Sequence, residues 1–265
     1  MITIPSMSGR HVAVLGLGKS GMAVARTLIH CGVHVLAWDD DEICHDRAKD
    51  ENLPLGDLMA EDFSPLAALV LSPGIPHSFP EPHPVVTRAR AAGCEIIGET
   101  ELLSRADTGA TFIGITGTNG KSTTTALIGH ILDQAGHTTQ TGGNLGVPSV
   151  ALEETGPGGY YVLEMSSYQL ELVSTLVFDI AILLNISPDH MGRHGGLAGY
   201  MSAKERIFAN QNSSHVAVIG IDDSHSRGLF ESLKAKGKSL AIPVSGVDRA
   251  GGGVYLENGW LVNDI

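Results

Sequence analysis

The segment Gly114-Ile-Thr-Gly-Thr-Asn-Gly-Lys-Ser-Thr-Thr-Thr125 constrains the fold of this chain more than any other segment. It follows an apolar run from Ala110 to Ile115 and opens a helical pattern at Lys121, so it predicts a strand, a tight loop and a helix in that order. The backbone N–H groups of such a loop converge on an anion at the helix N-terminus. The segment therefore predicts a phosphate site for ATP or GTP in an α/β fold.

The residues of this loop have separate expected roles. Two glycines allow the tight turn, Lys121 reaches the outer phosphates, and the Ser122 hydroxyl is a ligand for Mg²⁺. The usual pattern G-x-x-x-x-G-K-[ST] would place its first glycine where this chain has Ile115. The alternative is a glycine-rich turn beside a solvated lysine, which the strand, loop and helix setting disfavours. The residues expected to bind the nucleotide are Gly117, Thr118, Asn119, Gly120, Lys121, Ser122 and Thr123.

Short runs of Val, Ile and Leu alternate with helix-period segments, which is typical of parallel strands joined by crossover helices. The expected fold class is α/β, with two domains at residues 1–107 and 108–265. Prolines and a glycine exclude regular structure from 72–84, and Asn258-Gly259 predicts a β-hairpin over 253–262. Expected strands are 11–15, 33–38, 66–71, 95–97, 110–115, 160–163, 180–184, 215–219 and 239–242, with helices at 20–31, from 121 onward and at 199–209.

Composition limits the partners and the compartment. A formal net charge of −12 argues against binding to nucleic acids or anionic membranes, because a protein that binds either one needs a basic surface. The 3 cysteines form no C-x-x-C pair, and no signal peptide or membrane-spanning run of about 18 apolar residues is present in the sequence. We therefore expect a cytoplasmic protein without membrane insertion. A monomer is the expected oligomeric state.

A second glycine motif, Gly16-Leu-Gly-Lys-Ser-Gly21, matches G-x-G-x-x-G between a predicted strand and a predicted helix. Acidic residues 39–41 end the next strand, as in dinucleotide-binding folds. Taken alone, the motif favours NAD, with the phosphates of another nucleotide or a purely structural turn as alternatives. A dehydrogenase, however, has no need of Lys121 and Ser122.

Polar side chains also follow the apolar strands of the second half. Glu164 ends the strand at 160–163, and Asp189 and His190 come after the strand at 180–184, so all are placed at the carboxyl edge of the sheet. Glu164 is a candidate Mg²⁺ ligand or a solvated glutamate, and His190 a metal or phosphate contact or a structural histidine. Composition alone describes Lys204 as a solvated helix lysine.

These motifs together resemble the Mur ligase family of peptidoglycan synthesis. The phosphate loop of that family is the shortened G-T-N-G-K-[ST] form, so Ile115 supports the resemblance. The run Ser-Ser-Tyr-Gln-Leu-Glu at 166–171 is most similar to the branch that adds D-glutamate. The matching segments are 16–21, 71–75, 97–102, 117–122, 142–146, 163–171, 189–191 and 200–208.

The resemblance implies an ATP-dependent ligase that joins D-glutamate to UDP-N-acetylmuramoyl-L-alanine. ATP phosphorylates the L-alanyl carboxylate, and the D-glutamate amine then attacks the acyl phosphate, which leaves an amide, ADP and phosphate. Positioning and charge neutralisation supply most of such catalysis. The resemblance also implies a Rossmann-like UDP-substrate domain, a P-loop ATPase-type central domain, and a further Rossmann-like domain for D-glutamate beyond Ile265. We therefore expect these 265 residues to be inactive alone.

The resemblance assigns roles to individual residues. Lys121 and the loop backbone hold the β and γ phosphates, while Ser122 and Glu164 hold one Mg²⁺. His190 helps to hold a second Mg²⁺, and Asn144 contacts the reacting carboxylate or phosphate. The residues expected to bind the UDP part of the substrate are Gly16, Leu17, Gly18, Lys19, Ser20, Gly21, Asp39, Ser72, Pro73 and Gly74.

The resemblance gives Lys204 a second interpretation, as a lysine carbamylated by CO₂ that becomes a carboxylate-like metal ligand. A lysine near dications loses its proton more easily, and only the neutral amine attacks CO₂. Lys121, His190 and Lys204 are thus the expected catalytic residues. Two departures carry no role: Gly192 replaces a commonly acidic residue, and Asp40 and Asp41 are unusually acidic beside a diphosphate.

Three other functions stay open at this point. An NAD-dependent oxidoreductase explains the first glycine motif but leaves Lys121, Glu164 and Lys204 without a role. A folylpolyglutamate-synthase-like ligase shares the ATPase plan and the modified lysine, but it lacks an N-terminal UDP-binding domain. A non-catalytic nucleotide-binding module is the third alternative.

Overall fold

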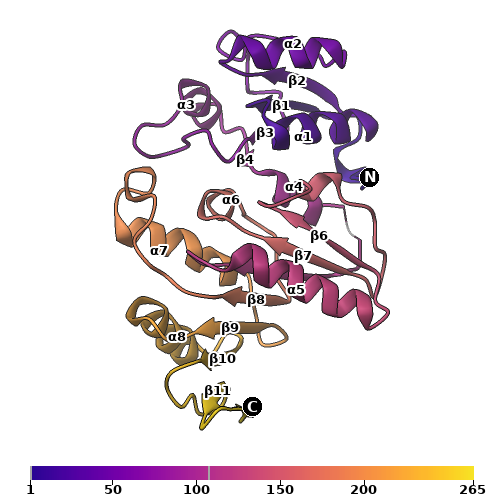
Figure 1. The fold of residues 1–265 in the computed structure, drawn as a ribbon. Helices are drawn as coiled ribbons and strands as arrows, with labels where there is room; N and C mark the ends of the chain where they lie inside the picture. Colours follow the sequence, from indigo (N-terminus) through magenta and orange to yellow (C-terminus); the bar gives the residue numbers. More distant parts are fainter. Residues whose placement is uncertain (1, 107) are drawn as a thin grey trace.

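The computed structural model describes residues 2–106 and 108–265, and it contains two α/β units stacked one above the other (Figure 1). The expected α/β class is confirmed, with a Rossmann-like first unit and a central unit of the P-loop ATPase type. The boundary expected at 107 and 108 touches residue 107, which lies outside the described residues. It stays a prediction.

The first unit is a four-stranded parallel sheet in the order β2-β1-β3-β4. Because β2 and β3 flank β1, the chain changes direction at β1, which is where open α/β sheets bind ligands. Its elements are η1 (Pro5–Met7), β1 (His11–Leu15), α1 (Lys19–His30), β2 (His34–Trp38), α2 (Glu42–Asp50), β3 (Ala68–Leu71), α3 (Pro84–Ala91), β4 (Ile96–Ile97) and α4 (Glu99–Ser104).

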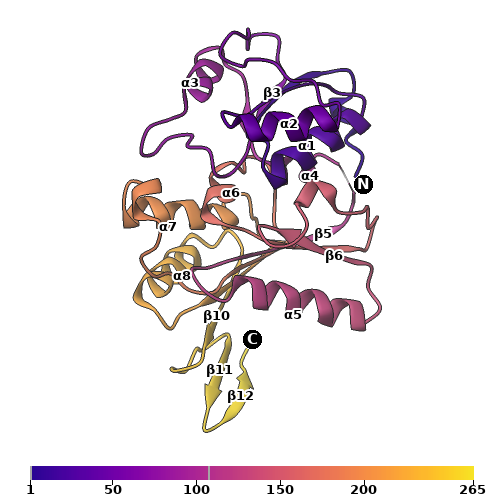
Figure 2. The same cartoon turned by 45° about the horizontal axis from the view of Figure 1, so that its top comes forward.

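The second unit has an eight-stranded sheet in the order β12-β11-β10-β9-β8-β5-β7-β6. Its pairings are parallel except for the terminal hairpin β11-β12, which projects from the molecule (Figure 2). The elements are β5 (Thr111–Thr116), α5 (Lys121–Gln134), β6 (Thr139–Gly143), η2 (Ser149–Ala151), β7 (Tyr160–Glu164), α6 (Ser167–Glu171), β8 (Ile180–Leu183), η3 (Met191–Arg193), α7 (Leu197–Glu205), η4 (Arg206–Phe208), β9 (Val216–Gly220), α8 (Ser224–Lys236), β10 (Leu240–Ser245), β11 (Val254–Glu257) and β12 (Trp260–Asn263).

The expected strands are confirmed, and each begins within two residues of its expected start. The segment expected to be irregular at 72–84 is irregular as far as His83, and Pro84 instead opens α3. The hairpin at Asn258-Gly259 is confirmed. The helix expected at 199–209 is instead α7 followed by the 3-10 turn η4. Sequence reasoning missed α2, α3, α4, α6, α8 and β6.

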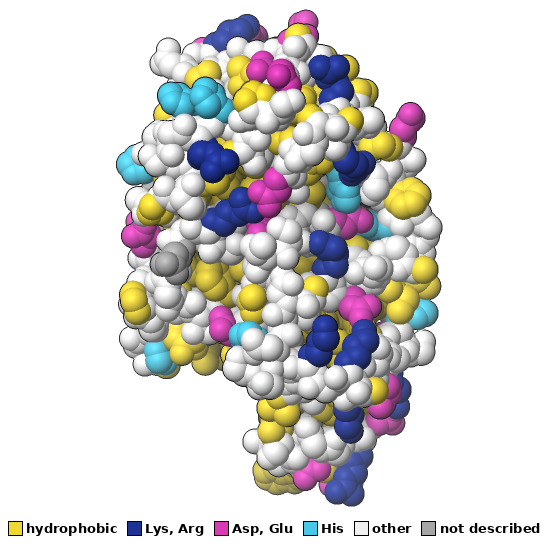
Figure 3. Space-filling view, turned by 180° about the vertical axis from the view of Figure 1, so that it is seen from behind, with side chains coloured by type: hydrophobic (Ala, Val, Ile, Leu, Met, Phe, Trp, Pro, Cys, Tyr) yellow, Lys and Arg dark blue, Asp and Glu magenta, His cyan; other side chains and the backbone are white. Residues whose placement is uncertain are grey.

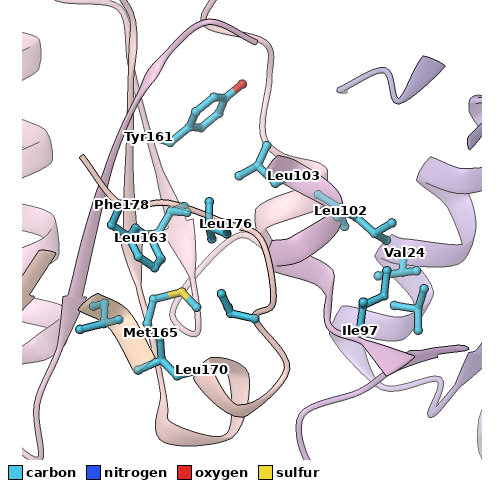
Figure 4. Close-up of a cluster of buried hydrophobic side chains, with 14 of the residues drawn as sticks. Val24, Ile97, Leu102, Leu103, Tyr161, Leu163, Met165, Leu170, Leu176 and Phe178 are labelled. Atoms are coloured by element: carbon cyan, nitrogen blue, oxygen red, sulfur yellow. The ribbon is translucent and has the colours of Figure 1, made fainter. Parts of the chain in front are cut away.

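One hydrophobic core runs through both units. Figure 4 shows Leu102 and Leu103 of α4 between Val24 and Ile97 of the first unit and the side chains of the second sheet. On the second side the core continues through residues such as Tyr161, which is fully buried. Burial of apolar surface at this junction holds the units in a fixed relation.

Glu99 is a buried acid at this junction. Its side chain is 2% exposed, and only one oxygen has a hydrogen bond, from Gln169 Nε2 at 3.2 Å. Burial raises the pKa of Glu99 to about 7, because the bond from Gln169 offsets only part of the desolvation.

Replacing Glu99 by glutamine is expected to stabilise the protein at alkaline pH relative to acidic pH. Above the ordinary pKa of 4.5 the unfolded chain ionises at Glu99 while the folded chain does not, until the pH passes about 7. The stability that the protonated Glu99 contributes to the folded state is fully present below pH 4.5 and is lost as the pH rises to about 7. Between about pH 4.5 and pH 7, the difference in free energy of unfolding between Glu99→Gln and the original protein should therefore shift by ~3 kcal/mol in favour of the variant. Urea unfolding near pH 4.5 and pH 8 measures the change, and equal differences at both would contradict it.

Charges are mixed on the surface. Figure 3 shows Lys and Arg side chains spread from top to bottom of one face, with Asp and Glu side chains between them. Among the described residues, none of the helices combines the length and the apolar character needed to cross a bilayer.

Candidate functional site

The phosphate loop follows β5 and leads into α5. Gly120 stands immediately before this helix with φ +83°, a conformation that favours glycine. Lys121 Nζ donates to the carbonyls of Gly117 at 2.9 Å and Thr118 at 3.0 Å, so the loop wraps around its own ammonium group. Ser122 is the second residue of α5 and Thr123 the third, so the loop has the form of an anion site at a helix N-terminus.

Asn185 fixes this loop from the end of β8, and sequence reasoning gave it no role. Its Oδ1 accepts from Asn119 N at 2.9 Å, and its Nδ2 donates to Asn119 O at 3.1 Å. Beside it, Thr118 Oγ1 lies 3.1 Å from Tyr200 Oη. A polar residue directly after an apolar strand was the available signal for Asn185.

Four of the expected site residues line one cavity of about 150 Å³ at the carboxyl edge of the second sheet. They come from α5, the loop after β6, the segment after β8, and α7. The cavity is lined by Lys121, Asn144, Ser166, Ser167, Tyr168, Asp189, His190, Tyr200 and Lys204.

Lys204 is buried in this cavity wall, which contradicts the solvated-lysine alternative. Its side chain is 1% exposed, and Nζ donates to Gly117 O at 2.9 Å and lies 4.7 Å from the centre of the Tyr200 ring. Burial lowers the pKa of Lys204 to about 7, and the positive charge of Lys121 adds to the effect. A substantial fraction of this amine is therefore neutral and nucleophilic near pH 7.

Glu164 is also buried rather than solvated, at 2% exposure. Its Oε1 accepts from Asn144 Nδ2 at 2.8 Å, while its Oε2 is buried without a hydrogen-bond partner. A free, buried carboxylate oxygen is a suitable donor for Mg²⁺. The described residues include no group of three or more His, Cys, Asp or Glu that could hold a metal unaided. Further ligands would have to come from other groups, such as hydroxyls and phosphates.

His190 has a more open position than the other candidates. Its side chain is 54% exposed, its backbone has φ +50°, and its Nε2 lies 3.5 Å from Asp189 Oδ2. The ring packs 5.3 Å from that of Tyr168. His190 is therefore accessible to a ligand at the mouth of the cavity.

The glycine motif of the first unit borders a separate cavity of about 460 Å³. Ser72 Oγ donates to Gly16 O at 2.9 Å, and the Asp39 carboxylate accepts from Leu17 N, so both polar side chains brace the motif. Lys19 Nζ reaches across to the carbonyl of Gly146 in the second unit. The cavity is lined by Gly16, Gly18, Lys19, Ser20, Asp39, Asp40, Ser72, Pro73, Gly74, Ile75, Pro76 and His83.

Two expected substrate contacts do not line this cavity. Leu17 is fully buried in the core, and its backbone N–H is taken by Asp39. Gly21 lies inside α1, where a Cβ would come within 1.7 Å of the Gly16 carbonyl. These two residues support the backbone of the motif and do not face the cavity.

Gly21→Ala is expected to distort the motif, because a backbone carbonyl cannot move away from the new methyl group cheaply. We expect a loss of about 3 kcal/mol in the free energy of unfolding. Gly18→Ala is the matched control, since a Cβ there meets nothing within 4 Å and φ is −65°. Thermal and urea unfolding compare the two, and equal stability of both variants would contradict the steric argument.

Two family models match the chain. One describes the Mur ligase middle domain and matches residues 115–250, and the other describes the MurD-like N-terminal domain of Mur ligases and matches residues 10–98. The matches include both glycine loops and the residues around both cavities.

Curated relatives of the chain are named UDP-N-acetylmuramoylalanine--D-glutamate ligase. The protein from Caulobacter vibrioides strain NA1000 / CB15N is 46% identical over 98% of this chain, and that from Rhodospirillum rubrum is 48% identical over 99%. The chain spans 57% and 56% of the lengths of these relatives.

Solved structures share the fold at low identity. The UDP-N-acetylmuramate:L-alanyl-gamma-D-glutamyl-meso-diaminopimelate ligase of Neisseria meningitides matches with a TM-score of 0.61 at 15% identity, covering 96% of this chain and 84% of that one. The UDP-N-acetylmuramate-alanine ligase of Thermotoga maritima matches with a TM-score of 0.54 at 19% identity, covering 94% and 54%.

Proposed function

This chain belongs to the Mur ligase family, and from that premise we propose that it carries the UDP-substrate and ATP sites of a D-glutamate ligase. The reaction joins the L-alanyl carboxylate of UDP-N-acetylmuramoyl-L-alanine to the amine of D-glutamate, with ATP cleaved to ADP and phosphate. The observation that carries this proposal is one cavity lined by Lys121, Asn144, His190 and Lys204, with the free oxygen of Glu164 held beside Asn144.

The residues of the cavity divide the work of phosphoryl transfer between them. Lys121 and the loop backbone neutralise and orient the outer phosphates of ATP, which suits a reaction that depends on positioning and charge. Asn144, held by Glu164, presents its amide to the acid that is phosphorylated. Tyr200 and Lys204 line the cavity beside them, and closely packed walls of this kind exclude water from a reactive acyl phosphate.

Magnesium fits the donors that line this cavity and those held beside it. Glu164 Oε2 and the Ser122 hydroxyl would hold one Mg²⁺, and His190 with a carbamylated Lys204 would hold a second. When bound, the ions neutralise phosphate charge that Lys121 alone leaves unbalanced. The lowered pKa of Lys204 supports the carbamate, because a neutral amine is the form that adds CO₂.

In the first unit, we assign the larger cavity to the UDP end of the substrate. Ser20 and Lys19 open α1 beside this cavity, where the helix N-terminus favours a diphosphate. Because ATP and uridine-linked precursors are supplied inside the cell, the cytoplasm is the proposed compartment, with the protein acting as a monomer. D-glutamate is the proposed second substrate.

The test of this function is D-glutamate-dependent phosphate release by the full-length gene product. Release from ATP should require UDP-N-acetylmuramoyl-L-alanine, D-glutamate and Mg²⁺ together, and mass spectrometry should identify the amide product. Phosphate release that ignores D-glutamate would contradict the ligase assignment. Binding of NADH to the glycine motif of the first unit, measured as a change in NADH fluorescence, would favour the oxidoreductase instead.

A further inference from the structure

A single carboxylate joins the two cavities. Glu171 ends α6 and is mostly buried, with its side chain 13% exposed. Its Oε2 accepts from His77 Nε2 at 2.9 Å, and its Oε1 accepts from His194 Nδ1 at 2.8 Å. His77 belongs to the irregular loop of the first unit, whereas His194 follows η3 in the second. Sequence reasoning assigned Glu171, His77 and His194 no role.

On the side of the second cavity, His194 links Glu171 to Ser167 by hydrogen bonds at its two ring nitrogens. The His194 side chain is fully buried, and its Nε2 lies 2.9 Å from Ser167 Oγ. A carboxylate can only accept, so His194 Nδ1 donates to Glu171, and His194 Nε2 shares a hydrogen bond with the Ser167 hydroxyl. Ser167 lines the cavity with Lys121, so this hydrogen bond fixes its hydroxyl at the cavity wall.

On the side of the first cavity, the same carboxylate anchors the loop at 72–83. Arg193 adds a second tie, since its Nη2 donates to Ile75 O at 2.9 Å and its Nη1 lies 3.5 Å from Glu171 Oε2. This loop begins with Ser72, Pro73 and Gly74, which line the cavity assigned to UDP. The loop is therefore tied to Glu171 directly by His77 and indirectly by Arg193.

The charge balance favours an ionised Glu171. Burial alone would raise the pKa of its carboxyl, but the hydrogen bonds from His77 and His194 outweigh burial and hold the pKa below its ordinary value. An ionised carboxylate accepts from both histidines at once, which a neutral acid or an amide cannot do in the same geometry.

We propose that Glu171 is a positioning residue that couples the loop of the UDP cavity to the orientation of Ser167 in the reaction cavity, through His77 on one side and His194 on the other. The coupling rests on the proposed function. It means that a substrate bound in the first cavity affects the orientation of Ser167 in the second.

A double-mutant cycle tests the coupling in the full-length gene product. His77→Ala and Ser167→Ala are each expected to lower kcat/KM for the uridine-linked substrate roughly tenfold, and the double variant by much less than the roughly hundredfold expected of independent sites. In a Glu171→Gln background the same two changes should become additive. Additivity in both backgrounds would overturn the proposal.

Two further variants separate coupling from loss of structure. His77→Gln keeps an N–H donor for Glu171 and should retain activity within about threefold. His83→Ala removes a histidine near the end of the same loop that bonds Asp40 at 2.8 Å, and it should combine additively with Ser167→Ala. If His83→Ala instead coupled as His77→Ala does, the effect would belong to the loop as a whole and the proposal would fail.

A spectroscopic measurement keeps the test independent of turnover. In ¹⁵N-labelled protein, His194 should be protonated at Nδ1, and its ring nitrogen shifts should change in Glu171→Gln and His77→Ala but not in His83→Ala. Unchanged shifts would overturn the coupling even in an active enzyme. Changed shifts in a protein without D-glutamate-dependent phosphate release would support the coupling and reject the proposed ligase function.

Discussion

Lys121→Ala in the full-length gene product is expected to lower the rate of D-glutamate-dependent phosphate release by about a thousandfold. The side chain is held by the carbonyls of Gly117 and Thr118, so its ammonium lies within the phosphate loop. Its loss removes a preorganised charge that matters most as negative charge shifts between phosphate oxygens. Steady-state kinetics at saturating substrates measure the effect on kcat.

Controls for this variant separate charge from shape. Lys238→Ala removes an exposed lysine near the end of α8 and should leave the rate unchanged. Lys121→Arg keeps the charge but replaces a compact ammonium by a planar fork, and it should recover only part of the rate. Turnover of Lys121→Ala within about threefold of the original protein would exclude the phosphate role.

Lys204→Met is expected to abolish turnover to a similar extent, about a thousandfold, without lowering the stability of the fold at neutral pH. The buried amine has a pKa of about 7 in the folded chain against 10.5 for an ordinary lysine. Between these values the unfolded chain binds a proton that the folded chain does not, so the stability of the original protein rises with pH across that window. A methionine carries no such penalty.

The measurement combines kinetics with unfolding at two pH values. The advantage in free energy of unfolding of Lys204→Met should be largest near pH 7 and should shrink toward pH 10. Intact mass of the original protein should include a form about 44 Da heavier that is lost on acidification, and this form should be absent in the variant. Full turnover of the variant would reject any role of Lys204 in the reaction.

The sequence predicted those parts of the fold that depend on local pattern. Strands such as β1 and β8 are short apolar runs, and the loops after β1 and β5 carry glycines where the chain turns. β6 was missed because Thr-Gln-Thr-Gly-Gly lacks an apolar signal, and this edge strand is held by its pairing with β7. α4 was missed because it is only six residues long and gains its stability from packing between the two units.

The candidate site was predictable where residues follow a strand and unpredictable where they meet across the fold. Glu164 ends the apolar strand β7, so the strand-end rule placed it at the carboxyl edge of the sheet. Asn144 follows the neighbouring strand β6, which the sequence did not predict, so only the family resemblance named it. The contacts of Glu171 with His77 and His194 join residues 94 and 23 positions apart. Periodicity cannot report such contacts, since they depend on how the two units are packed.

The continuous core through α4 fixes the distance between the two cavities. Since Leu102 and Leu103 are packed against both units, the cavity beside Gly16 and the cavity beside Lys121 cannot slide apart freely. If one uridine-linked substrate occupies both, as we propose, it must span a set distance between its uridine end and its reacting acid. On that proposal, we expect a precursor one residue longer or shorter to place its carboxylate away from Asn144, so that the packing of Leu102 and Leu103 would select substrates by length.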